Sequence, residues 1–368
     1  MKILFPIGSI YPSQQGGPSN SVYWLAKGLV SKDIEITIVS TDVMLNNTIK
    51  RGIWLDLGYG NVIFHNSKVH SIPLKCILTA NKELKKTDII HLNSIFYPYS
   101  WIMGLLALWY QKKIVWSIRG ELDEKALIYS TWKKKIHLFF FKILFAQKAI
   151  FHVTSEEEKK FTISILGKKA KVFDIPNYMI LPKRIIAPKL PYFSYIGRIH
   201  PKKAIENLIE ALSLSKMFLN SEFTFKIAGD INNGYGEQLQ KQVYSLGLTR
   251  KVTFEGHLEG DLKEEFLAKS YFSFMPSHTE NFGLVVIEAL AQGTPVIASK
   301  GSPWQVLNEL NIGYWVENDA KSLSQAINQI LLLRQEEYKN MSKNAHEYVT
   351  QHFDIYHNVD KWIEVYNR

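Results

Sequence analysis

Two basic residues and two glutamates in the second half of the chain have the types and spacing to bind a diphosphate and hydrogen-bond donors of one ligand. Arg198 and Lys203 stand five residues apart across a predicted strand-to-helix turn, so both cations can reach one diphosphate. Arginine offers a planar fork of donors and lysine a point charge, the usual pairing for phosphate oxygens. Glu280 precedes a predicted helix, and Glu288 lies on it among Val, Ile, Ala and Leu. A carboxylate there is unusual unless it accepts ligand hydrogen bonds.

Each of these residues also has a structural interpretation. The turn with Arg198 and Lys203 can be a solvated basic turn, Glu280 can cap the helix, and Glu288 can pair with a lysine.

The elements that position these residues follow from short β-branched runs that alternate with longer amphipathic segments. In the first half, strands are predicted at Lys2–Pro6, Glu35–Ser40, Asp88–Leu92, Ile114–Ile118 and Ala149–Thr154, and helices at Ser19–Val30, Tyr99–Tyr110 and Trp132–Gln147. The proline-containing stretch Lys171–Pro191 is predicted to be a linker. After it the predicted strands are Tyr192–Ile196, Thr224–Ala228, Lys251–Phe254, Phe272–Met275, Thr294–Ala298 and Gly313–Val316, again separated by helices.

Strands separated by helices pair in parallel, so the expected fold class is α/β with two Rossmann-like, doubly wound domains that face each other across a cleft. We expect an N-terminal domain at 1–180, a C-terminal domain at 181–351, and a C-terminal helix at 352–368 that packs back on the first domain. Parallel sheets bind ligands at the carboxyl ends of their strands.

The segment Ser277–Val296 is predicted as strand, loop, helix, turn and strand. Asn281, Phe282 and Gly283 would open the helix and leave its first N–H groups free for an anion. Here the sequence resembles the retaining glycosyltransferases of the two-domain GT-B architecture, specifically family 4, whose signature is two glutamates separated by seven residues. The resemblance implies that Glu280 contacts the hydroxyls of a donor sugar and that Glu288 binds the nucleotide ribose.

Further segments share the resemblance. Tyr195–Ala204 is similar to the strand-Gly-Arg-Leu-x-x-x-Lys-Gly turn of the family, with Ala204 in place of the glycine. The resemblance implies Glu280, Arg198 and Lys203 as catalytic residues. It also implies a donor site formed by Glu288, Asn281, Phe282, Gly283, Leu284, Gly16, Gly17, Gly229, His257 and Leu258.

Two residues of the first half are acceptor-side candidates. Arg119 stands where many relatives have a histidine that faces the cleft, and it is expected to bind donor or acceptor oxygens or, alternatively, to fix its loop. His91, near the end of a predicted strand, can face the cleft or be a structural histidine.

These matches imply a retaining hexosyltransferase that moves a hexose or N-acetylhexosamine from a nucleotide sugar, UDP-linked rather than GDP-mannose, to a lipid-linked saccharide in surface polysaccharide synthesis. No cofactor and no metal are expected, because the chain has no Asp-x-Asp motif. The alternatives are a nucleotide-sugar epimerase on the same scaffold and a nucleotide-sugar-binding accessory protein that has lost transfer. A nucleic-acid partner is not expected, because the basic residues accompany no recognition module.

The chain has 368 residues with 44 Lys+Arg and 34 Asp+Glu, a net charge of +10. Residues 1–180 hold 24 of the basic and 13 of the acidic residues, so the first half carries essentially all the excess. The basic, aromatic segment Trp132–Lys148 can lie on an anionic bilayer, while Phe139–Phe145 can instead be the buried face of a helix. A single cysteine, Cys76, and the absence of a signal peptide or an apolar run of about 18 residues predict a cytoplasmic protein, peripheral at the inner face of the membrane.

Overall fold

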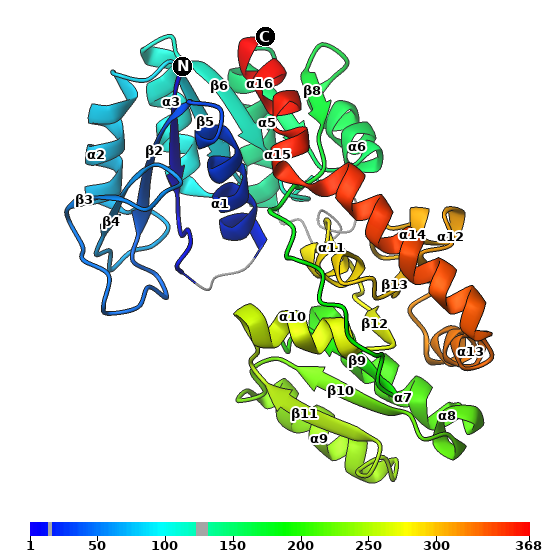
Figure 1. The fold of residues 1–368 in the computed structure, drawn as a ribbon. Coiled ribbons are helices and arrows are strands. Elements are labelled where there is room, and N and C mark those ends of the chain that lie inside the picture. Colours follow the sequence, from blue (N-terminus) through cyan, green and yellow to red (C-terminus); the bar gives the residue numbers. More distant parts are fainter. Residues whose placement is uncertain (14–16, 123–131) are drawn as a thin grey trace. The chain divides into compact units, whose positions relative to one another are not determined.

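The computed structural model describes residues 1–13, 17–122 and 132–368, which divide into two compact units (Figure 1). The first unit comprises Met1–Ile180 together with Asp354–Arg368, and the second comprises Leu181–Phe353. Each unit has one predominantly parallel sheet with helices on both faces, so the predicted doubly wound α/β class is confirmed.

The first unit contains an eight-stranded sheet in the order β3-β4-β2-β1-β5-β6-β7-β8, in which only the β3–β4 pair is antiparallel. Its strands are β1 (Lys2–Ile7), β2 (Glu35–Thr41), β3 (Trp54–Asp56), β4 (Asn61–His65), β5 (Ile89–Asn93), β6 (Lys113–Ser117), β7 (Ala149–Val153) and β8 (Lys171–Asp174). Its helices are α1 (Gly17–Val30), α2 (Leu74–Leu84), α3 (Pro98–Trp109), α5 (Trp132–Phe145), α6 (Glu156–Leu166), α15 (Ile355–Asn358) and α16 (Asp360–Asn367).

The second unit contains a six-stranded parallel sheet in the order β11-β10-β9-β12-β13-β14. Its strands are β9 (Tyr192–Ile196), β10 (Thr224–Ala228), β11 (Val252–Gly256), β12 (Phe272–Met275), β13 (Val296–Ser299) and β14 (Gly313–Val316). Its helical segments are η1 (Pro201–Lys203), α7 (Ile205–Leu214), α8 (Lys216–Asn220), α9 (Gly234–Ser245), α10 (Gly260–Lys269), α11 (Leu284–Ala291), α12 (Val306–Glu309), α13 (Ala320–Leu331) and α14 (Gln335–Phe353).

Local sequence explains where these elements form. All five residues of β5 are buried, as expected for a central parallel strand that helices cover on both faces. Helix α6 begins after Ser155, whose side chain accepts a hydrogen bond from the Glu158 N–H group, and three glutamates occupy its first turn, where the helix dipole favours negative charge. The predicted linker begins later than expected, because Lys171–Asp174 pairs with β7.

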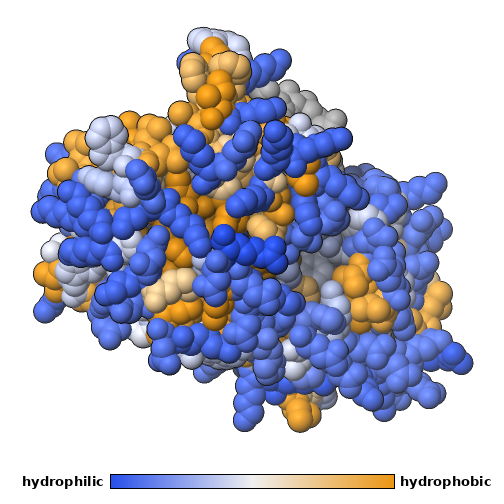
Figure 2. All heavy atoms as spheres, turned by 90° about the horizontal axis from the view of Figure 1, so that it is seen from above, coloured by the Kyte–Doolittle hydropathy of each residue, from blue (hydrophilic) through white to orange (hydrophobic). Residues whose placement is uncertain are grey.

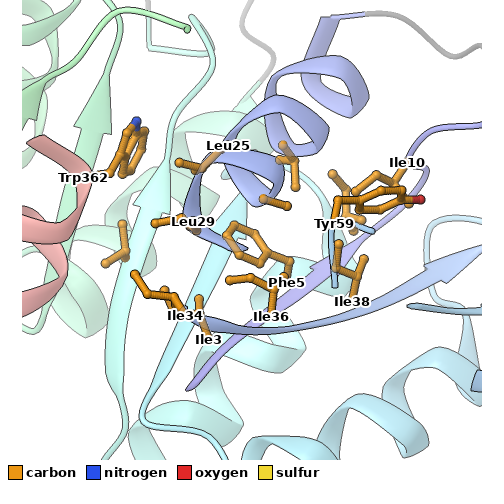
Figure 3. Packing of buried hydrophobic residues seen from close by; sticks show 14 of the residues in the cluster. Ile3, Phe5, Ile10, Leu25, Leu29, Ile34, Ile36, Ile38, Tyr59 and Trp362 are labelled. Atoms are coloured by element: carbon orange, nitrogen blue, oxygen red, sulfur yellow. The ribbon is translucent and has the colours of Figure 1, made fainter. Parts of the chain in front are cut away.

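The last fifteen residues complete the core of the first unit. Trp362 is 4% exposed and packs in the same cluster as Phe5, Leu25 and Ile36 from the amino-terminal strands and helix (Figure 3). Gly28 on α1 allows the close approach, because a Cβ atom there would lie 2.4 Å from Ile355. The expected single helix at 352–368 is divided, since α14 ends at Phe353 and α15 and α16 follow.

Replacing Trp362 with alanine is expected to lower the free energy of unfolding by about 3–5 kcal/mol, because the substitution leaves a large cavity in this core. Urea unfolding measures the change. Trp109→Ala is the matched control: Trp109 is 81% exposed, and its loss should change the free energy by no more than about 0.5 kcal/mol. Equal effects of the two substitutions would contradict the placement of Trp362.

Candidate functional site

The site in the second unit is set by strand order. β9 and β12 are adjacent and parallel, while the chain proceeds from β9 towards β11 on one side and from β12 towards β14 on the other. Ligands of open α/β sheets bind at such a switch point, outside the carboxyl ends of the strands. The loop after β9 carries Arg198 and Lys203, and the loop after β12 carries Glu280. The sheet therefore brings together the three residues predicted as catalytic.

The two loops are joined by main-chain and side-chain contacts. Lys203 Nζ forms an ion pair with a Glu280 carboxylate oxygen, and both side chains are about four-fifths buried. The His278 N–H group donates to the Lys202 carbonyl oxygen over 3.0 Å, and the Glu280 N–H group donates to the Gly301 carbonyl oxygen over 2.7 Å. The Glu280 carboxylate therefore pairs with Lys203 and does not cap the helix.

Arg198 differs from Lys203 in its surroundings. Its side chain is exposed, and within the described part of the chain no carboxylate pairs with its guanidinium. Its carbonyl oxygen accepts a hydrogen bond from the buried Tyr195 hydroxyl over 2.9 Å, which fixes the turn. Ala204, at the position expected to favour glycine, has φ 50° and lies in the left-handed region, where an L-residue is strained and glycine is not.

Glu288 pairs with a lysine that is not among the predicted site residues. Its carboxylate accepts a hydrogen bond from Lys263 Nζ over 2.8 Å, between α11 and α10. The side chains are 17% and 29% exposed, so the pair is partly shielded from water. The structure therefore agrees with the lysine-paired interpretation of Glu288. No motif marks Lys263, and only the packing of α10 on α11 reveals it.

The start of α11 has the features expected of an anion site. Gly283 precedes the helix with φ 83°, and a Cβ atom there would lie 2.5 Å from Met275 Sδ, so only glycine fits. Phe282 is buried against Trp304, whose indole N–H group donates to its carbonyl oxygen. The N-cap residue Gly283 has no side chain to cap the helix, which begins at Leu284 after the loop that contains Asn281. The Val286 N–H group donates to the Gly283 carbonyl oxygen over 3.0 Å, and the positive end of the helix dipole lies at this start, where it favours an anion.

The other predicted donor residues are distributed more widely. A Cβ atom on Gly229 would lie 2.2 Å from the Gly197 carbonyl oxygen, so glycine allows the loops after β9 and β10 to approach. His257 and Leu258 follow β11 at the same edge of the sheet, and the His257 ring lies 3.7 Å from Glu259. Gly17 begins α1 in the first unit, and Gly16 lies outside the described residues.

Arg119, the first acceptor-side candidate, is held by two asparagines. Its guanidinium donates to Asn93 Oδ1 over 2.8 and 3.0 Å and to Asn177 Oδ1 over 3.0 Å, and its backbone has φ 63°. Burial lowers its pKa to about 10, which leaves the group charged at neutral pH. These contacts correspond to the loop-fixing interpretation of Arg119.

His91, the second acceptor-side candidate, is fully buried in a hydrogen-bond chain. Its Nδ1 lies 2.6 Å from the Tyr366 hydroxyl and its Nε2 lies 2.7 Å from Ser117 Oγ, which in turn lies 2.8 Å from His152 Nδ1. His152 Nε2 donates to the Ile175 carbonyl oxygen over 2.8 Å. If each hydrogen is used once, both imidazoles are neutral and every polar atom of the chain is satisfied. His91 therefore occupies the structural role, with both ring nitrogens engaged.

Because both histidines of this hydrogen-bond chain are buried and neutral, we predict that the protein loses stability in acid. Burial lowers the pKa of His152 to about 3 and that of His91 well below its usual range. Histidines of the unfolded chain titrate near 6.5, so below that pH the unfolded state binds more protons than the folded state. The free energy of unfolding should fall by about 1.4 kcal/mol per pH unit for each histidine as the pH drops from 6.5.

Urea unfolding of the wild type and of His152→Gln between pH 7 and 5 measures this contribution. The slope of the unfolding free energy against pH should be smaller in the variant than in the wild type by the contribution of about one histidine. His70→Gln, at an exposed position, should match the wild type. Comparison with a variant is needed because burial raises the pKa of Glu121 and Glu158, which gives the opposite slope. Identical slopes for wild type and His152→Gln would contradict the neutral pair.

No three His, Cys, Asp or Glu side chains come close enough to hold a metal ion within residues 1–13, 17–122 and 132–368. Within the same ranges, no helix is sufficiently long and apolar to span a bilayer.

Comparison with known proteins shows which family and which relatives this chain resembles. The family model described as Glycosyl transferases group 1 matches residues 180–348. An uncharacterized glycosyltransferase of Methanocaldococcus jannaschii is 32% identical over 123 residues, which cover 33% of this chain and 30% of that protein. An uncharacterized 41.2 kDa protein in the cps region of Klebsiella pneumoniae is 25% identical over 247 residues, 63% of this chain and 65% of that protein. This chain thus spans less than two thirds of the length of both relatives.

Solved structures extend the similarity to the whole fold. The Anabaena protein HepE in complex with UDP-glucose aligns with 99% of this chain and 100% of its own, at 18% identity and a TM-score of 0.77. The predicted GT-B fold is confirmed by this likeness.

Proposed function

Because the model of the glycosyl transferases group 1 family matches residues 180–348, we propose that this chain is a member of that family and transfers a hexose or N-acetylhexosamine from a nucleotide sugar with retention of anomeric configuration. The observation that carries the proposal is the convergence of Arg198, Lys203 and Glu280 at the switch point beside the start of α11. Arg198, Lys203 and the positive end of the α11 dipole are three sources of positive potential that suit a departing nucleoside diphosphate.

The donor is placed by exchange of the existing ion pair. The diphosphate takes Lys203 from Glu280 and also binds Arg198 and the N–H groups at the start of α11. The released Glu280 carboxylate then accepts hydrogen bonds from the sugar hydroxyls. Glu288, oriented by Lys263, binds the ribose. Diphosphate and sugar therefore bind cooperatively, because each satisfies one partner of the broken pair.

The chemical step is bond exchange at the anomeric carbon. The bond from C1 to the diphosphate oxygen breaks with oxocarbenium character, and the acceptor oxygen bonds to C1 on the same face. The acceptor proton moves to the leaving diphosphate. The two cations and the helix dipole stabilise the negative charge that develops on the diphosphate, which is the main electrostatic requirement of the step. We propose that these charges act without a metal.

The names of similar proteins and the net charge of the first unit support a more specific proposal for the donor and the acceptor. HepE was solved with UDP-glucose, which supports a UDP-sugar rather than GDP-mannose. The relative from the cps region supports a role in surface polysaccharide synthesis with a lipid-linked saccharide acceptor at the inner face of the cytoplasmic membrane. Residues 1–180 and 354–368 contain 26 Lys+Arg and 16 Asp+Glu, whereas residues 181–353 contain 18 of each. The excess of basic residues in the first unit suits an acceptor with negative charge.

Removal of one cation tests the site. With UDP-glucose as donor and extracted lipid-linked saccharides as acceptor, Arg198→Ala and Lys203→Ala should each lower kcat/KM by about 10²–10³, the scale for losing one electrostatic donor to a transition state. Lys202→Ala is the matched control, because Lys202 is adjacent and exposed. Transfer by either variant within tenfold of the wild type would exclude these roles. Isomerisation of the UDP-sugar without acceptor would indicate the nucleotide-sugar epimerase. Binding of the donor without release of UDP would indicate the accessory protein that has lost transfer.

The exchange of the ion pair has its own test. Glu280→Gln should bind UDP about two- to fivefold more tightly, because Lys203 no longer has to leave a carboxylate. The same variant should transfer sugar poorly. Calorimetry with UDP alone and transfer assays with UDP-glucose measure the two effects. Weaker UDP binding by Glu280→Gln would show that the pair does not compete with phosphate.

Chelation tests the metal-independent assignment. Transfer after treatment with excess EDTA should stay within about twofold of the untreated enzyme, because fixed cations and the helix dipole carry the phosphate charge. Loss of transfer that Mg²⁺ or Mn²⁺ restores would overturn this assignment.

A further inference from the structure

Helix α5 has two apolar faces, of which only one is used in the core. Phe141 and Phe145 are fully buried and pack against Trp116, with ring centroids 4.8 and 4.9 Å apart, and Trp101 on α3 contacts both. This is the buried face expected of a domain helix. It leaves the other aromatic residues of α5 to point elsewhere.

The second face forms a stripe along the exposed side of α5. It consists of Trp132, Ile136, Phe139, Phe140 and Ile143, which are 68%, 47%, 62%, 51% and 62% exposed. Their spacing follows the helical repeat, so they share one side. Figure 2 shows that hydrophobic side chains also reach the surface between hydrophilic ones on the face it presents. Isolated exposed apolar residues are ordinary, but an unbroken stripe over the length of a helix is not.

Lysines border the stripe. Lys133, Lys135 and Lys142 are exposed on the same helix, which contains no acidic residue. The first unit, to which α5 belongs, carries the whole excess of basic residues. An aromatic stripe between lysines matches a surface with negative charge above and hydrocarbon below, which is the interface of an anionic bilayer. Two copies of this face would instead oppose their lysines.

We propose that the stripe of α5 is a docking surface for an anionic lipid bilayer, with Phe139, Phe140 and Ile143 inserted below the headgroups and the lysines at the lipid phosphates. The inference deepens the proposed function, because it names the surface that would hold the enzyme beside a lipid-linked acceptor. Binding itself requires neither the donor nor the acceptor, so the two proposals can fail separately.

The test uses the full-length protein and vesicles that contain no glycosyl acceptor. The protein should sediment with vesicles of phosphatidylcholine and phosphatidylglycerol, and less with phosphatidylcholine alone. Replacing Phe139, Phe140 and Ile143 with serine should abolish sedimentation with the anionic vesicles. Replacing Lys133, Lys135 and Lys142 with glutamine should weaken it by about a hundredfold at low salt, because each lysine near the surface contributes several-fold.

The matched control replaces Tyr244, Leu262 and Leu332 with serine, since these residues of the second unit are 79%, 64% and 69% exposed. It should bind vesicles as the wild type does. Unfolding curves show whether the serine variant is folded, and the glutamine variant, which alters only exposed side chains, gives a second measurement. Equal vesicle binding by wild type and both α5 variants would overturn the proposal. So would a wild-type dimer that ignores vesicles and becomes monomeric in the serine variant.

Transfer separates this inference from the proposed function. Both α5 variants should keep transfer to a detergent-dispersed acceptor and lose transfer to the same acceptor in vesicles. Vesicle binding by a wild type that shows no transfer would contradict the proposed function and leave the docking surface intact.

Discussion

The candidate donor site depends on one constraint, the adjacency of β9 and β12 in a parallel sheet. Because their connections run in opposite directions, the two loops leave the same edge of the sheet with no helix between them. Residues almost eighty positions apart in the chain, Lys203 and Glu280, thereby come into contact. The glycines at 229 and 283 serve the same purpose, since a side chain at either position would collide with its neighbours.

The charged side chains Lys203, Glu280, Lys263 and Glu288 of this site form ion pairs with one another. Lys203 is matched by Glu280 and Glu288 by Lys263, and none of the four is more than 29% exposed. Partly buried charges without partners would be costly, and each of the two pairs satisfies both of its members. A ligand that carries both phosphate and hydroxyl groups can replace each partner, whereas a ligand with only one of them leaves a charge unmatched.

The sequence was sufficient for the alternation of strands and helices, and for the turn that holds Arg198 and Lys203. It was sufficient for these because both are encoded locally, in periodicity and in residues a few positions apart. It could not identify Lys263, which reaches Glu288 only through the packing of two helices. It also left open the roles of His91 and of α5, because a pattern with two apolar sides does not say which side the core takes. Contacts between residues far apart in the chain decide such cases. Tyr366 forms a hydrogen bond with His91, and Trp116 packs against Phe141 and Phe145.

The return of residues 354–368 to the first unit imposes an order on biosynthesis. Strands β1 to β8 leave the ribosome early, but their core lacks Ile355, Val359 and Trp362 until the second unit has been translated. The second unit is one continuous segment and can fold completely while apolar residues around α1 in the first unit are still exposed. A nascent chain that ends at about Phe353 would therefore carry a complete second unit beside an incomplete first unit, a natural substrate for chaperones.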